Sequence, residues 1–428
     1  MKIYTLKNIP LSVKNRILNR NQPGQTNLIP VVTRLINDVK KNGDQALFKY
    51  TYQYDLAKLK SLLISPQEFI NAAKFATPDF LRAIKQASEN ISKVCRSQIP
   101  KNTKPLQTSS GIKVWKKWLP IERIGLYIPG GKATYPSTLL MTVIPAQIAG
   151  CKDIIMVTPP KPDGSISPYI LNTAYQLGIK KIYKVGGAQA IAALAYGTRT
   201  IPKVDKIFGP GNSYVNTAKL AVSNIVGIDL PAGPSEAMII ADDSANPVWI
   251  AADLITDAEH GFDSASVFLT TSAKLCRQVC REIEIQTKSL ETAKYISSSF
   301  VKNGLFAVTD TITEAVDFAN LYAPEHLLLF INNPSIYLNK VKNAGSVFVG
   351  QYTCKSSGDY ATGANHVLPT SQASKYSSPL GVEAFGKWIE FQSCTKLGLS
   401  RVQKTVETLS IIEGLPAHFN SISKRFEI

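Results

Sequence analysis

The stretch "RIGLYIPGG" (residues 123–131) joins a short apolar run to a turn of proline and glycine. This combination is typical of a buried β-strand that ends in a tight turn. Helix-like stretches separate it from further strand-like runs, and this alternation predicts parallel βαβ units and an α/β fold. The further runs are "KDIIMVTPP" (152–160), "KKIYKVGG" (180–187), "KIFGPGN" (206–212) and "EAMIIADD" (236–243).

The same rhythm resumes further along the chain, which predicts a second α/β block. Residues from about 25 to 100 instead space their apolar side chains three and four positions apart, as in amphipathic helices. The tail from about residue 381 is expected to be mostly helical. The strand-like runs of the second block are "SASVFLTT" (264–271), "GLFAV" (304–308), "HLLLFI" (326–331) and "GSVFVG" (345–350).

The composition is that of a globular protein. Of the 428 residues 44% are hydrophobic and 18% are charged, so the chain can bury a sizeable core. No apolar run reaches the ~18 residues of a membrane-spanning helix, and the first residues lack the apolar core of a secretory signal. We therefore expect a soluble, cytoplasmic protein. Its six cysteines form no CxxC pair and are expected to be free thiols, with Cys276 and Cys280 packed on one helix face rather than holding a metal.

The net charge of +17 raises the hypothesis of a nucleic-acid partner. The basic residues are dispersed, however, and no zinc-finger or RNA-recognition motif accompanies them. A solvated basic surface, which also favours anionic substrates or cofactors, explains the charge better. Neither a nucleic-acid partner nor a membrane partner is expected.

Three glycine-rich turns follow strand-like runs. Glycine lets backbone N–H groups approach a phosphate, and the end of a helix dipole adds positive potential there. None of the turns is the GxGxxG dinucleotide motif, and each alone is also explained as a strand-to-helix connection. Together they favour a nucleotide cleft at the carboxyl ends of the strands. The turns are "YIPGGKATYP" (127–136), "KVGGAQA" (184–190) and "IFGPGNSYVNTAK" (207–219).

All four histidines stand near carboxylates in the sequence. His260 follows Asp257 by three positions, so a helix would place both side chains on one face, where they could hold one metal ion. His326 directly follows Glu325, and this pair offers two proton acceptors with different ordinary pKa values. Each histidine alone is more often structural, but together they favour an enzyme site and leave a Zn²⁺ ion open. The other pairs are His366 with Asp359 and His418 with Glu413.

The longest motifs resemble those of the histidinol dehydrogenase family, in the same order and at similar separations. The resemblance runs from about residue 25 to the end of the chain, and such a set of long motifs is specific. The motifs are "PIERIGLYIPGGKATYPSTLLM" (120–141), "KVGGAQAIAALAYGT" (184–198), "VDKIFGPGN" (204–212), "GIDLPAGPSE" (227–236), "DAEHG" (257–261), "APEHL" (323–327), "GDYATGANHVLPT" (358–370), "SPLGV" (378–382) and "EGLPAH" (413–418).

The resemblance implies a homodimeric enzyme with one zinc ion per subunit that uses NAD. It oxidises L-histidinol to L-histidine in two steps, through an aldehyde that the enzyme holds. The implied fold has two incomplete Rossmann-like parallel-sheet domains, and its tail is swapped between the subunits. The expected boundaries are residues 1–24 for a helical N-terminal arm, 25–126 together with 237–380 for the first α/β domain, 127–236 for the NAD-binding domain and 381–428 for the dimerisation tail.

Carried over by position, the resemblance implies a role for each matching residue. His326 would take the alcohol proton and Glu325 would activate water, which makes them the catalytic pair. The NAD contacts would be Tyr127, Gln189 and Asn212. The zinc ligands would be Asp257, His260, Asp359 and His418, the last from the neighbouring subunit, and these also face the substrate. The remaining substrate contacts would be Ser235, His326, His366 and Glu413.

Two positions depart from the family pattern. Asp257 stands where the family usually has glutamine, so two carboxylates and two neutral imidazoles would make the zinc site formally neutral. Lys355 stands where the family usually has glutamate beside the substrate, and its charge would repel a cationic amino alcohol. Either Lys355 turns into solvent, which the retained Glu413 and His366 favour, or the substrate has changed to an acidic alcohol such as a sulfonate.

The sequence thus leaves three hypotheses for the function. The first is a zinc- and NAD-dependent histidinol dehydrogenase. The second is a dehydrogenase of the same fold for another small polar alcohol, which Lys355 and Asp257 suggest. The third, a basic nucleic-acid-binding protein without catalysis, is disfavoured by the intact Glu325 and His326.

Overall fold

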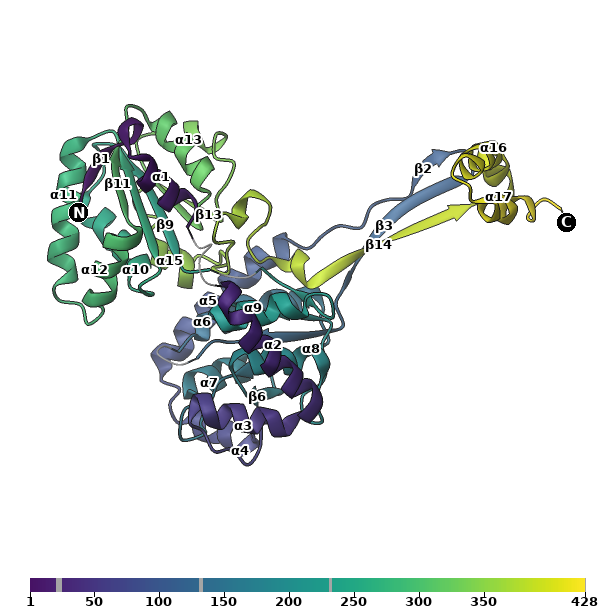
Figure 1. Cartoon of the computed structure of the whole chain (residues 1–428), viewed down its shortest axis with the longest axis horizontal. Coiled ribbons are helices and arrows are strands. Elements are labelled where there is room, and N and C mark those ends of the chain that lie inside the picture. Colours follow the sequence, from purple (N-terminus) through teal and green to yellow (C-terminus); the bar gives the residue numbers. More distant parts are fainter. Residues whose placement is uncertain (21–24, 131–133, 231–232, 428) are drawn as a thin grey trace.

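A computed structural model describes the chain except residues 21–24, 131–133, 231–232 and 428. The described strands form two parallel sheets with helices around them and an antiparallel ribbon that projects away from both (Figure 1). The expected α/β class with parallel sheets is confirmed. Residues 131–133 of the first glycine turn lie outside the described residues.

The five-stranded parallel sheet has the order β6-β5-β4-β7-β8. Its central strand β4 (Arg123–Tyr127) comes from the stretch "RIGLY", and four of these five residues are buried because helices cover both faces of the sheet. The other elements of this half are β5 (Asp153–Thr158), β6 (Ile182–Lys184), β7 (Lys206–Phe208), β8 (Gly227–Ile228), α6 (Pro136–Ala149), α7 (Pro168–Gln176), α8 (Gly187–Tyr196) and α9 (Ser213–Val222).

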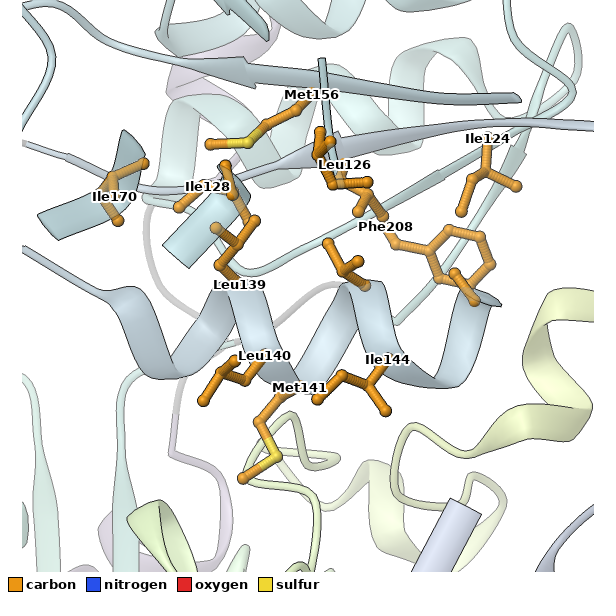
Figure 2. Packing of buried hydrophobic residues seen from close by; sticks show 14 of the residues in the cluster. Ile124, Leu126, Ile128, Leu139, Leu140, Met141, Ile144, Met156, Ile170 and Phe208 are labelled. Carbon is orange, nitrogen blue, oxygen red and sulfur yellow. The ribbon is translucent and has the colours of Figure 1, made fainter. Parts of the chain in front are cut away.

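Helix α6 is apolar around most of its circumference because it is covered on opposite sides. Figure 2 shows Leu139 on the side of Leu126 in β4 and of Ile128 just beyond it, while Leu140 and Met141 point the other way. On that second side α6 contacts α5 (Pro78–Ser97) and the turn of 3-10 helix η3 (Val382–Phe385).

Helices from the first quarter of the chain pack on this same five-stranded half. The apolar stripe of α2 (Gln25–Asn42), which includes Val32 and Val39, shares a core with the alanines of α8. Helix α4 (Pro66–Ala73) contacts α7, and α3 (Asp44–Asp55) contacts α2 and α8. This packing differs from the expected grouping of residues 25–126 with 237–380. The amphipathic pattern predicted the helices but could not tell which sheet their apolar faces would cover.

The six-stranded sheet has the order β1-β11-β10-β9-β12-β13, and its neighbouring strands are parallel. Its central strands are fully buried. The elements of this half are β1 (Ile3–Thr5), β9 (Glu236–Ala241), β10 (Ala265–Thr270), β11 (Leu305–Val308), β12 (His326–Phe330), β13 (Ser346–Val349), η1 (Leu6–Asn8), α1 (Leu11–Leu18), α10 (Pro247–Ala258), α11 (Ala273–Thr287), α12 (Ala293–Asn303), α13 (Ile312–Tyr322), α14 (Ser335–Leu338), α15 (Lys355–Tyr360) and η2 (Ala373–Lys375).

The C-terminal tail forms a long arm together with residues that follow α5. Strand β14 (Gly386–Cys394) pairs antiparallel with β3 (Ile112–Pro120), which also pairs with β2 (Leu106–Ser109). Helices α16 (Lys396–Ile412) and α17 (Pro416–Ser423) stand at the far end of this ribbon (Figure 1). The mostly helical tail was thus expected correctly except for β14, whose strand depends on its pairing with β3.

Two expectations from composition are met in the described residues. All six cysteines are free, and Cys276 and Cys280 are buried together on one helix. No described helix is long and apolar enough to cross a membrane.

Candidate active site

Glu325 and His326 stand at the amino-terminal end of β12, a central strand of the six-stranded sheet. There His326 lies in register with Ala237 of β9, and both Glu325 and His326 are buried. The residue before them, Pro324, follows the left-handed Ala323 (φ 52°) that ends α13. This turn fixes the direction in which the two side chains leave the sheet.

The hydrogen bond of the His326 ring decides which of its nitrogens is free. Nδ1 lies 3.0 Å from the backbone carbonyl oxygen of Glu236, and because a carbonyl only accepts, Nδ1 carries the proton. Nε2 is buried and has no hydrogen-bond partner among the described residues. Burial, reinforced by the nearby Lys355 ammonium, lowers the pKa of His326 to about 3. His326 is therefore a neutral imidazole whose Nε2 is available as a proton acceptor.

The carboxyl group of Glu325 is held by the same backbone segment. The backbone N–H of Glu236 donates to Glu325 Oε2 at 2.9 Å, and that oxygen lies 3.7 Å from His326 Nδ1. Burial and then the neighbouring Asp257 carboxylate raise the pKa of Glu325 well above its ordinary value. A carboxylate in such surroundings is a stronger base than one in water.

Glu236 itself is fixed by a residue that the sequence did not single out. The Arg20 guanidinium donates to both carboxylate oxygens of Glu236, at 2.9 and 2.7 Å, and stacks 3.4 Å from the ring centroid of Tyr322. Arg20 and Glu236 are both buried. Glu236 ends the motif "GIDLPAGPSE", whereas nothing in the sequence near Arg20 marks it.

A group of buried acceptors that includes Glu325 and His326 could hold a cation. Asp257 on α10, Glu325 and His326 each offer a ligand atom, and these atoms lie within 4.8 Å of one another. Neither carboxylate oxygen of Asp257 has a hydrogen-bond partner among the described residues, although both are buried. Asp359 Oδ1 lies 3.8 Å from His326 Nε2. Such oxygen and nitrogen donors suit a Zn²⁺ ion.

The three residues expected to contact NAD lie at the carboxyl ends of strands in the other half. Tyr127 ends β4, and its hydroxyl accepts from the N–H of Gly187 at 3.2 Å. Gln189 is buried in the first turn of α8, and Asn212 caps α9 by accepting from the Val215 N–H at 3.1 Å. Tyr127, Gln189 and Asn212, one from each glycine-rich turn, therefore lie at the same edge of the five-stranded sheet.

The chain matches the family described as histidinol dehydrogenase over residues 18–426. The chain belongs to this family. It is 41% identical to the histidinol dehydrogenase of Methanosarcina barkeri over 426 residues, with 100% of this chain and 98% of the relative covered. The relative from Listeria monocytogenes is 44% identical, with 92% of each chain covered. The crystal structure of histidinol dehydrogenase from Elizabethkingia anophelis has a TM-score of 0.95 and 42% identity, covering 100% of this chain and 98% of that one.

Membership of the histidinol dehydrogenase family makes the chain an NAD-dependent dehydrogenase. It places the reaction in histidine biosynthesis and makes the substrate a small molecule. The α/β architecture with two parallel sheets matches that of the histidinol dehydrogenase from Elizabethkingia anophelis.

The expectation that Lys355 turns into solvent is wrong. Its side chain is 2% exposed, and its Nζ lies 2.9 Å from Asp359 Oδ2 and 3.4 Å from Asp257 Oδ1. Its backbone N–H donates to Asp253 Oδ1 at 3.1 Å, which ties the start of α15 to α10. Desolvation disfavours the ammonium form, but the Asp257 and Asp359 carboxylates outweigh it and raise the pKa of Lys355.

The expected substrate contacts outside the arm are connected to this cluster, either by a hydrogen bond or by a neighbouring position in the sequence. His366 Nδ1 donates to the Asp359 carbonyl at 2.9 Å, and His366 Nε2 lies 3.4 Å from Thr138 Oγ1 at the start of α6. Ser235 directly precedes Glu236 and β9. His260 follows the end of α10 and is exposed.

Two of the expected site residues lie away from the others in the single chain. Glu413 caps the end of α16 and His418 lies in α17; both are exposed at the tip of the arm (Figure 1). The described structure of one chain therefore does not bring them to Asp257 or His326.

Proposed function

We propose that this member of the histidinol dehydrogenase family oxidises L-histidinol to L-histidine in two NAD-dependent steps, through L-histidinaldehyde. The observation that carries the proposal is the buried pair of proton acceptors, the free Nε2 of His326 and the carboxylate of Glu325. An alcohol-to-acid oxidation has to remove one proton from the alcohol and another from water, which matches two bases of different strength.

In the first step His326 would accept the hydroxyl proton of the alcohol at Nε2. Its Nδ1–H bond to the Glu236 carbonyl keeps the ring in the required tautomer and orientation. NAD, when bound, supplies the hydride acceptor for each of the two oxidations. The low pKa of His326 lets the ring start each cycle unprotonated at neutral pH.

In the second step Glu325 would take a proton from water as the water attacks the aldehyde carbon. The raised pKa of Glu325 suits this role, because a general base works best when its pKa approaches the working pH. The Glu236 N–H holds one oxygen of Glu325, which orients the other carboxylate oxygen. The two bases would thus serve successive steps from fixed positions.

The donor set of the cluster fits a zinc ion. Asp257, His260 and Asp359 of one chain would hold the metal together with His418 of a second copy. The burial of both Asp257 oxygens, with Lys355 as the only described ion-pair partner besides His326, supports this assignment. Zinc, when bound, supplies a Lewis acid that orients the imidazole and amino groups of the substrate. Ser235, His366 and Glu413 would complete the substrate contacts, the glutamate facing an ammonium group.

We infer a dimer in which each tail completes the other subunit's site. The arm carries large exposed apolar side chains on α16, with Leu409, Ile411 and Ile412 more than half exposed. So many exposed apolar side chains on α16 favour burial against another chain. A swapped tail would bring Glu413 and His418 to the catalytic pair that they lack in the single chain.

The proposed division of labour follows the two halves of the chain. The glycine turns of residues 127–236, with Tyr127, Gln189 and Asn212, would bind NAD, and the six-stranded half would hold the substrate. The two incomplete Rossmann-like domains of the proposal thus face each other across the site. Since α2–α5 pack on the five-stranded half, we assign residues 25–97 to the NAD-binding half.

The buried position of Lys355 removes the observation that favoured an acidic alcohol as substrate. In the metal-free chain its charge is balanced by Asp257 and Asp359, which explains the buried lysine without an anionic substrate. L-histidinol is therefore the substrate that we propose.

The test of this function is the stoichiometry of the reaction. Purified, zinc-loaded protein is mixed with NAD and L-histidinol, and NADH and histidine are measured together. Two NADH per histidine are expected. Turnover of another alcohol without turnover of L-histidinol would contradict the proposal.

The shared site is tested by mixing two inactive variants. His326→Ala and His418→Ala each damage a different half of every site in a swapped dimer. After subunit exchange a mixed dimer has one intact site, so activity should return to about a quarter of the unaltered level. A site built from one chain alone would stay inactive in the mixture.

A further inference from the structure

The two departures from the family pattern touch each other. Lys355 Nζ lies 3.4 Å from Asp257 Oδ1, so the unusual lysine and the unusual aspartate form one buried ion pair. The same ammonium lies 2.9 Å from Asp359 Oδ2. Lys355 therefore bridges two of the carboxylates that the proposed function assigns to the metal.

We propose that the Lys355 ammonium is a built-in competitor for the metal site, which a divalent ion has to displace from Asp257 and Asp359. The inference rests on the metal ligands given in the proposed function. It concerns how tightly and how fast those ligands take up a metal, not which alcohol the enzyme oxidises.

Charge and space both support the competition. Two carboxylates balance one divalent ion, and with the ammonium still between them the group would carry an excess positive charge in a buried place. Zinc–oxygen distances of about 2.0–2.2 Å require the metal to approach the same oxygens that Lys355 contacts. An ammonium and a divalent ion at this range repel each other strongly, because little solvent screens them.

The position of Lys355 also makes displacement possible. Its backbone is fixed, because its N–H donates to Asp253 and α15 begins at this residue. Its side chain has a four-carbon stem with several rotatable bonds, so Nζ can leave the carboxylates while the backbone stays in place. If the lysine contacts the carboxylates in most metal-free molecules, only the remaining molecules can bind metal. The apparent metal affinity then falls in proportion to the fraction of molecules in which the lysine has left.

The experiment compares zinc binding by the full-length, metal-stripped protein and by Lys355→Met. Zinc is titrated against a chromophoric chelator, without substrate or NAD. The variant should bind zinc at least tenfold more tightly than the unaltered protein. Lys184→Met is the matched control, because Lys184 is also largely buried and paired with one carboxylate, that of Glu68. The control should bind zinc as the unaltered protein does.

Equal zinc affinity of Lys355→Met and the unaltered protein would overturn the inference. Failure of both to bind zinc would overturn it together with the metal part of the proposed function, while the NADH assay decides the dehydrogenase part separately.

A kinetic measurement needs no variant and separates displacement from simple repulsion. The rate of zinc uptake by the unaltered protein should level off as zinc is raised, because Lys355 has to leave first. A rate that rises in proportion to zinc at all concentrations would overturn the inference.

Discussion

Lys355 and Asp257 form a buried ion pair, with 3.4 Å between Nζ and Oδ1, in the cluster that also holds Glu325 and His326. The two side chains compensate each other in charge. The ammonium is shared with Asp359, so Asp257 is not left as an uncompensated buried charge.

The ion pair predicts strong coupling between Asp257 and Lys355. Asp257→Asn, Lys355→Met and the double variant form a cycle that urea unfolding of metal-free protein can measure. Each single change leaves a buried charge with fewer partners, and the double change removes both, so we expect a coupling free energy of about 1–3 kcal/mol. Additive effects of the two substitutions would mean that the contact contributes nothing to stability.

The role of His326 predicts a selective loss of chemistry. His326→Ala should lower the rate of NADH formation by about 10²–10⁴-fold, because the alcohol loses its proton acceptor. Zinc content, measured on the same preparation, should stay near that of the unaltered protein. Parallel loss of activity and zinc would assign His326 to the metal instead.

The role of Glu325 predicts that the second oxidation suffers more than the first. Glu325→Gln keeps the size of the side chain but removes the base, so oxidation of added L-histidinaldehyde should fall by about 10²-fold or more. Rapid-quench measurement of the first NADH from L-histidinol should show a smaller loss. An equal loss in both steps would give Glu325 a role in the alcohol oxidation as well.

The buried ion pair of the Arg20 and Glu236 side chains predicts an effect on stability. Arg20→Met should reduce the free energy of unfolding by about 3 kcal/mol, because Glu236 would stay buried without its guanidinium partner. Urea unfolding measures this change, and the exposed Arg16→Met serves as control. A loss below that of the control would show that the pair does not stabilise the fold.

The raised pKa of Asp55, at the end of α3, predicts that the free energy of unfolding depends on pH. Burial raises its pKa to about 6 in the folded chain, so the folded state binds the proton more tightly than the unfolded state. The contribution of this group to the free energy of unfolding is fully present below about pH 4 and is lost as the pH rises through about 6. The full shift corresponds to about 3 kcal/mol, which partial exposure reduces to about 1 kcal/mol.

Asp55→Asn removes this titration and should flatten the dependence between pH 4 and 7. Urea unfolding of both proteins at several pH values measures the difference. A variant that loses stability with pH as steeply as the unaltered chain would assign the effect to other groups.

The amino-acid sequence by itself predicted the strands β4–β7 and β9–β13, the glycine turns, and Glu325 with His326 as a pair of proton acceptors. The apolar runs predicted the α/β class because a strand buried on both faces needs an uninterrupted apolar stretch. Glu325 and His326 could be predicted as a pair because they are adjacent in the sequence, at the start of one strand.

Only the tertiary structure decided what depends on distant partners. Arg20 reaches Glu236 across 216 positions, and no local pattern marks such a contact. The helices of residues 25–97 were predicted, but their apolar faces fit either sheet until packing selects one. Lys355 could have turned outwards, and it is buried because two carboxylates from α10 and α15 meet at its ammonium group, where mutual charge compensation offsets the loss of water.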